Sequence, residues 1–84
     1  MLTSLALMSL YRTPHVPLRE ISERYFGLGY EEAAKRAARN ALPVPTFRLV
    51  ASQKAPLMVS CEDLGNWIDQ RRDEAAKAWQ HCQI

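Results

Sequence analysis

The 84-residue sequence lacks a long hydrophobic run and carries little net charge. A membrane-spanning helix needs about 20 mostly apolar residues, and no stretch of that length occurs. Segment 1–11 is apolar, but no Lys or Arg precedes its leucines, so we expect no secretory signal peptide. These absences predict a cytoplasmic protein without a membrane partner.

Cysteines and histidines are few, and they do not form a metal-binding pattern. Cys61 and Cys82 are too far apart for a Cys-x-x-Cys site, and neither His15 nor His81 stands at a ligand spacing from them. There is also no nucleophile elbow and no P-loop, and the Gly-Leu-Gly sequence at 27–29 follows no predicted strand. We therefore predict reduced thiols, no metal, no cofactor and no enzymatic activity.

The composition that remains is that of one small folded domain spanning residues 1–84. The apolar fraction of 48% and the charged fraction of 24% are ordinary for globular proteins. The net charge of +2 is too small to indicate nucleic-acid binding by itself. However, five basic residues outnumber two acidic residues between 31 and 54, whereas acidic residues prevail between 62 and 77. The middle of the chain is therefore the basic part.

Two helices joined by an extended connector are predicted for the first part of the chain. Thr3 is a suitable N-cap for a helix that ends near Tyr11. The connector follows from Pro14 and Pro17, which favour extended backbone. Pro17 also suits the first turn of a second helix, which Gly27 is expected to end in a left-handed conformation.

A third helix is predicted for residues 30–41, which are rich in Ala, Glu, Lys and Arg. Within it, Ala34, Ala37 and Ala41 form a small-residue seam that allows close packing against a neighbouring helix. The basic side chains point elsewhere, so this helix is suited to dock on another molecule.

The last part of the chain predicts a hairpin and then a long helix. Two prolines stop the third helix, after which 46–50 and 57–60 alternate in hydrophobicity like the strands of a short hairpin. Ser60, with Asp63 three residues later, resembles a capping box. Apolar residues then recur at helical intervals as far as Trp79.

The order of helix, glycine turn, basic helix, hairpin and helix is that of a winged helix-turn-helix domain. We predict a mainly α fold with a small β-hairpin, comprising four helices and a two-stranded wing. In such domains the second helix of the pair enters the major groove of DNA. The helix at about 30–41 is therefore the predicted recognition helix, and the wing at about 46–60 is expected on the flanking backbone.

Several short runs of the sequence are distinctive. They are Leu-Pro-Val-Pro-Thr-Phe-Arg-Leu at 42–49, Ser-Gln-Lys-Ala-Pro at 52–56, Glu-Asp-Leu at 62–64, Val-Pro-Leu at 16–18 and Tyr-Phe-Gly at 25–27. Together these runs resemble the pyocin activator PrtN family of bacteria and their phages. The resemblance implies a transcriptional activator of phage or bacteriocin genes that binds an upstream DNA element. More distantly, the layout is similar to phage excisionases and MerR-type DNA-binding domains. Gly65 departs from the Ala expected there, and we expect it to cost a little stability.

Eight polar residues of the third helix and the wing are the predicted DNA contacts. Arg36 and Arg39 are expected at guanine bases, and Asn40 at an adenine. With the resemblance, Arg48 and Lys54 are expected at phosphates. The full set is Lys35, Arg36, Arg39, Asn40, Arg48, Ser52, Gln53 and Lys54.

A plainer interpretation exists for both elements. Lys35 and Arg36 stand four residues after Glu31 and Glu32, so ion pairs along the helix would make an ordinary solvent-exposed face. The polar residues 52–53 would by themselves indicate only an exposed loop, and the resemblance favours contacts with the DNA backbone or minor groove.

The apolar ends of the chain predict a homodimer. Leu5, Met8 and Trp79 add more apolar surface than so small a core covers. We therefore expect these three residues at a subunit interface, whereas Trp67 is expected in the core. The expected partners are double-stranded DNA, a second copy of the chain and, for an activator, RNA polymerase. An excisionase-like architectural protein and a phage-encoded module that sequesters a host factor remain open as alternatives, since both would use the same scaffold.

Overall fold

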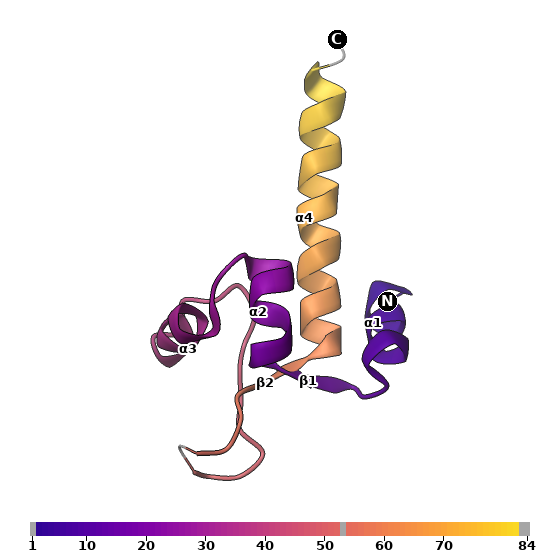
Figure 1. Ribbon diagram of the computed structural model, residues 1–84. Coiled ribbons are helices and arrows are strands. Elements are labelled where there is room, and N and C mark those ends of the chain that lie inside the picture. The colour runs from indigo at the N-terminus through magenta and orange to yellow at the C-terminus, as the bar shows by residue number, and fades with distance from the viewer. Residues whose placement is uncertain (1, 53, 83–84) are drawn as a thin grey trace.

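The computed structural model describes residues 2–52 and 54–82, which form four helices and a two-stranded antiparallel sheet (Figure 1). In chain order the elements are α1 (Leu2–Tyr11), β1 (His15–Pro17), α2 (Leu18–Phe26), α3 (Tyr30–Ala38), β2 (Met58–Ser60) and α4 (Cys61–Cys82). This architecture confirms the predicted winged helix-turn-helix class. Among the described residues, no helix combines the length and hydrophobicity that crossing a membrane requires.

The sheet pairs the proline-rich connector with the strand that follows the wing. Val16 of β1 lies opposite Val59 of β2, and both side chains are fully buried. The predicted strand at 46–50 is reduced to one bridge, in which Phe47 and Met58 exchange backbone hydrogen bonds of 3.0 and 2.7 Å. The expected hairpin therefore exists only at its base, and β2 pairs with β1 along its other edge.

The turn between α2 and α3 forms as predicted, but α3 is shorter than expected. Gly27 ends α2 with φ of 67°, the left-handed conformation that glycine adopts at low cost. At the other end of α3, Asn40 has φ of 54°, so the chain leaves the helix before Ala41. The buried seam consists of Ala33 and Ala37 rather than the predicted set, and Ala41 is exposed.

The hydrophobic core lies between α2, α3, the sheet and the first turns of α4. Leu18, Ile21 and Leu64 are its largest fully buried side chains. Phe26 of α2 and Trp67 of α4 pack against this core, and their rings make an edge-to-face contact with 5.1 Å between centroids. Trp67 thus belongs to the core, as predicted.

The first helix packs against α4 at a position without a side chain. A Cβ atom on Gly65 would lie 2.8 Å from the backbone N of Ser4 and 2.9 Å from its Cα. Gly65 therefore permits the close approach of the two helices, which corrects the expectation that it only costs stability. Thr3 is not the predicted N-cap, because it lies inside α1 and its hydroxyl donates a hydrogen bond to Asp69.

The start of α4 is held by a cap and by a buried thiol. Ser60 Oγ accepts a hydrogen bond of 3.2 Å from the backbone N–H of Glu62, as the capping pattern predicts. The Cys61 thiol donates to the carbonyl oxygen of Thr13 at 3.4 Å, and burial raises its pKa. Beyond this base α4 leaves the domain, since every residue from 70 to 82 is exposed.

Candidate nucleic-acid interface

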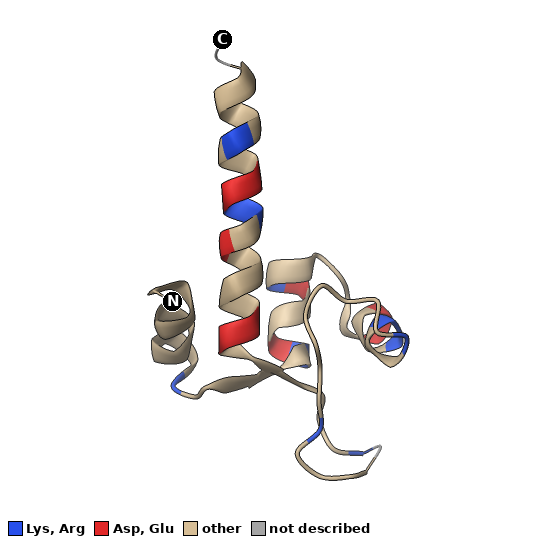
Figure 2. Ribbon diagram, turned by 180° about the vertical axis from the view of Figure 1, so that it is seen from behind, with Lys and Arg blue, Asp and Glu red and all other residues tan. Residues whose placement is uncertain are grey.

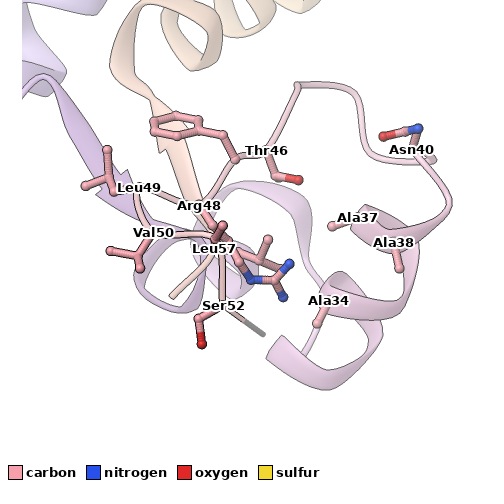
Figure 3. Close-up of a pocket in the computed structure, with 12 residues that line it drawn as sticks. Ala34, Ala37, Ala38, Asn40, Thr46, Arg48, Leu49, Val50, Ser52 and Leu57 are labelled. Atoms are coloured by element: carbon pink, nitrogen blue, oxygen red, sulfur yellow. The ribbon is translucent and has the colours of Figure 1, made fainter. Parts of the chain in front are cut away.

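The helix α3, which the sequence predicts as a recognition helix, and the wing border one cavity. This cavity of about 660 Å³ is lined by Ala34, Ala37 and Ala38 of α3 on one side and by wing residues 46–52 on the other (Figure 3). Small side chains on α3 leave this space open. The wing, taken as residues 46–60, therefore stands beside α3, so that both elements border the same region of the surface (Figure 1).

The predicted cations of α3 lie on the side of the helix that faces away from the core. Lys35 and Arg39 are exposed and Arg36 is half-buried, while Ala33 and Ala37 make the buried side. In the described part of the chain, Lys35 and Arg36 form no ion pair with the glutamates four residues earlier. The ion pairs on which the plainer interpretation rests are therefore absent from this structure.

Two predicted contacts lie just past the end of α3. Arg39 is the C-cap residue, with φ of −99°, and Asn40 follows in the left-handed conformation. Asn40 is exposed and lines the cavity between α3 and the wing. Its amide therefore extends from a turn rather than from the helix, which differs from the predicted helix boundary at 41.

Hydrogen bonds within the wing shape its tip. Arg48 Nε donates to the carbonyl oxygen of Ala55 at 3.2 Å, and the backbone N–H of Lys54 donates to Ser52 Oγ at 3.2 Å. Arg48 and Lys54 are both exposed, and Figure 2 shows that the charged segments of this loop are basic. Ser52 thus has a structural role as well. Gln53 lies outside the described residues.

One basic residue was missed by the sequence reasoning. Arg19, in the first turn of α2, lines a cavity of about 470 Å³ together with Arg48 and Lys54. Its guanidinium carbon lies 4.1 Å from the ring centroid of Tyr30, a cation–π contact that joins the start of α2 to the start of α3. The sequence did contain a signal for Arg19. It stands at the N-terminus of a helix, where anions are favoured, and this helix is the one expected to cross the DNA backbone.

The three residues predicted at a dimer interface are not gathered into one surface of the chain. Met8 is half-buried and packs against the domain's own core. Leu5 is 54% exposed on α1, whereas Trp79 is 63% exposed on the distant part of α4. Figure 1 shows that this part of α4 extends away from α3 and from the wing.

The arrangement offers cations and amides but no metal-binding cluster. Among residues 2–52 and 54–82, no group of three or more His, Cys, Asp or Glu side chains is placed to hold a metal ion. The basic side chains Arg19, Arg48 and Lys54 instead line one cavity between the start of α2 and the wing.

Comparison with known proteins identifies the family. Residues 3–75 match the family model described as pyocin activator protein PrtN, which covers α1, α2, α3, the wing and much of α4. Comparison with curated proteins and with solved structures finds no match. The family is one of regulatory activators and not of enzymes, and its description indicates activation of pyocin genes. The match agrees with the resemblance noted in the sequence: the chain belongs to the pyocin activator protein PrtN family.

Proposed function

We propose that the protein activates transcription of phage or bacteriocin genes by binding specific sites on double-stranded DNA. In this proposal α3 enters the major groove and the wing contacts the flanking backbone. The observation that carries it is the convergence of Arg19, Arg48 and Lys54 on one cavity beside the start of α3. These residues come from α2 and from the wing, the two elements that flank α3 in sequence.

The three converging cations are suited to phosphates. Side chains that contact phosphates position a protein on DNA without reading its sequence. Arg19 gains a further advantage from its place near the N-terminus of α2, where the helix dipole favours an anion. The guanidinium of Arg19 stacks on Tyr30, which holds the Arg19 side chain beside α3. A contact of Arg19 with a phosphate therefore sets the position of α3 on the DNA.

The dimensions and side chains of α3 suit the major groove. An α-helix with its side chains is about 10–12 Å across, and the major groove is about 12 Å wide. Lys35, Arg36 and Arg39 supply donors for guanine, and Asn40 supplies the amide that pairs with adenine. The small alanines on the wing side allow the helix to lie deep in the groove.

The decisive experiment is the selection of bound sites from a random DNA pool, followed by titration of the selected duplex. We expect Arg19→Ala and Lys54→Ala each to weaken binding to selected and unrelated duplexes alike. Lys77→Ala, an exposed cation on the far part of α4, is the matched control and should bind as the parent protein does. No enrichment of a common sequence, or equal losses from all three variants, would contradict the proposal.

An excisionase-like role in bending DNA is the second candidate, favoured by the wing tip. Leu49 and Val50 are 72% and 64% exposed at this tip. Proteins that kink DNA often insert apolar side chains between base steps in the minor groove. Gel mobility of a site placed at different positions along one fragment separates the roles, because only a bending protein makes mobility depend on the position of the site.

A further inference from the structure

The distant half of α4 is a helix without a neighbour in this chain. Its first turns pack against α1 and the core, but residues 70–82 are all exposed (Figure 1). Isolated helices shorter than about 12–15 residues are marginal in water, and packing of an apolar face is what usually stabilises them. Within this half, the salt bridge from Arg71 to Glu74 joins exposed side chains, and such pairs contribute little.

The exposed half has one mainly apolar side, which continues the side that α4 buries at its base and is interrupted by Arg71, three residues after Ile68 and four before Ala75. Ile68, Ala75, Trp79 and Cys82 follow Leu64 at intervals of three, four or seven residues, so all five lie along one face of the helix. We call the last four residues of this series the α4 stripe. Ile68 is half-buried in the domain, whereas Trp79 is 63% exposed.

The opposite side of the same half is polar throughout. Gln70, Asp73, Lys77 and His81 recur there at intervals of three or four residues. An amphipathic helix of this kind buries its apolar side against another element. Since no element of the chain reaches the far end of the α4 stripe, the covering surface comes from another molecule.

We propose that the α4 stripe is covered by the same stripe of a second copy of this chain, with the two helices antiparallel and crossing near Ala75. The alanines at the centre of the exposed half allow the helices to approach closely. This surface is separate from the candidate DNA interface, so the proposal goes beyond DNA binding and does not depend on it.

Charge and aromatic character along the α4 stripe favour the antiparallel direction. Arg71 lies within this face on the domain side of Ala75, with Arg72 at its edge, and Trp79 lies on the other side of Ala75. An antiparallel pair places the partner's Trp79 beside these arginines, where a guanidinium is attracted to the indole face. A parallel pair would place the arginines of the two copies at the same level, where like charges repel.

The two directions predict different disulfides between subunits. In the antiparallel pair the two copies of residue 75 meet at the two-fold axis, and the Cys82 thiols lie at opposite ends of the interface. In a parallel pair the two Cys82 thiols would be neighbours. The parent chain already carries the probe for a parallel pair, because its Cys82 is exposed and its Cys61 is buried.

Oxidative cross-linking of the full chain without DNA tests the direction. We expect Ala75→Cys in a Cys82→Ala background to form a covalent dimer rapidly, because residue 75 meets its copy across the axis. Lys77→Cys in the same background is the matched control on the polar side and should remain monomeric on a denaturing gel. Rapid cross-linking of parent Cys82, with none at position 75, would overturn the antiparallel pairing.

Sedimentation or light scattering tests the dimer itself, again without DNA. The parent protein should be dimeric at micromolar concentration, and Trp79→Ala should raise the dissociation constant by roughly 30-fold, as expected for a central tryptophan. Lys77→Ala should leave the dissociation constant unchanged. Circular dichroism and urea unfolding check that both variants fold, which is expected because both residues are exposed. A monomeric parent at these concentrations would overturn the proposal, whatever its affinity for DNA.

Discussion

Gly65 lies where α1 packs against α4, and the space that a side chain would occupy is taken by the backbone of Ser4. The effect of a mutation at this position depends on two opposing terms. Alanine is the better helix former by about 1 kcal/mol, but a Cβ atom 2.8 Å from a backbone nitrogen forces one helix to move. Overpacking of this kind costs about 1–3 kcal/mol.

We therefore expect Gly65→Ala to lower the free energy of unfolding by up to about 2 kcal/mol, the net of overpacking and helix propensity. Urea denaturation followed by circular dichroism measures this change. Asn66→Ala is the matched control, since Asn66 is the exposed neighbour of Gly65 in the same helix. Its effect should stay within about 0.5 kcal/mol. A stabilising Gly65→Ala change would contradict the observed packing of α1.

The two cysteines are predicted to differ in reactivity. Cys61 is buried and burial raises the pKa of its thiol, so at pH 7.5 it is protonated and shielded from reagents. Cys82 is exposed near the end of α4. Thiol-reagent titration of the Trp79→Ala variant, in which the proposed α4 interface is weakened, should modify one cysteine per chain in native buffer, and peptide mapping should identify Cys82. The second thiol should react only after unfolding, and rapid native labelling of Cys61 would be inconsistent with its burial.

At the scale of the elements, α3 and the wing are assigned different tasks in DNA binding. A base contact from α3 discriminates between sequences, whereas a phosphate contact from the wing releases counterions on any sequence. Both tasks are performed by positive side chains, so affinity for one duplex cannot separate them. Affinity for several duplexes at several salt concentrations separates them.

We expect Arg36→Ala to cost roughly 1–3 kcal/mol on the selected site and to relax the preference at one base position, with little effect on unrelated DNA. Lys54→Ala should weaken all duplexes alike and reduce the slope of log affinity against log salt by about one. Fluorescence anisotropy titrations measure both quantities. If Lys54→Ala altered base preference while Arg36→Ala weakened every duplex equally, the roles of helix and wing would be exchanged.

The sheet is the element that the sequence predicted least well. Alternating hydrophobicity indicated strands on both sides of the wing, and on the second side Val59 is fully buried in β2. Its partner was misassigned because Val16 lies between prolines, which suggest a connector. A strand of three residues needs only a few backbone hydrogen bonds, so Pro17 at its end does not prevent pairing.

At the scale of the whole molecule, the long axis of α4 separates two surfaces with different predicted partners. The candidate DNA interface of α2, α3 and the wing lies toward one end, with acidic and basic residues on both helices and basic residues on the wing, and the exposed part of α4 extends from the other (Figures 1 and 2). An antiparallel pair of α4 helices would hold the two domains at opposite ends of a two-fold assembly. Each domain would then read one half of a symmetric DNA site.

The dimer therefore predicts a symmetric site with a fixed spacing. We expect the selected sequences to form an inverted repeat whose half-site centres lie about 34–36 Å apart, or a multiple of this distance. Inserting about five base pairs between the halves rotates them to opposite faces of the duplex, and affinity should fall toward that of a single half-site. Unchanged affinity after this insertion, measured by gel shift, would show that the halves are bound independently.

Local chemistry along the chain determined the turn at Gly27 and the cap at Ser60, because a left-handed residue and a helix cap depend on a few neighbouring residues. Composition and hydrophobic period likewise determined the order of the four helices. Only the tertiary structure decided that Val16 pairs with Val59, that Gly65 is required beneath α1 and that Arg19 joins the wing cations. Each of these features joins residues far apart in the chain, and the separation of two packed backbones is a property of their contact rather than of either segment.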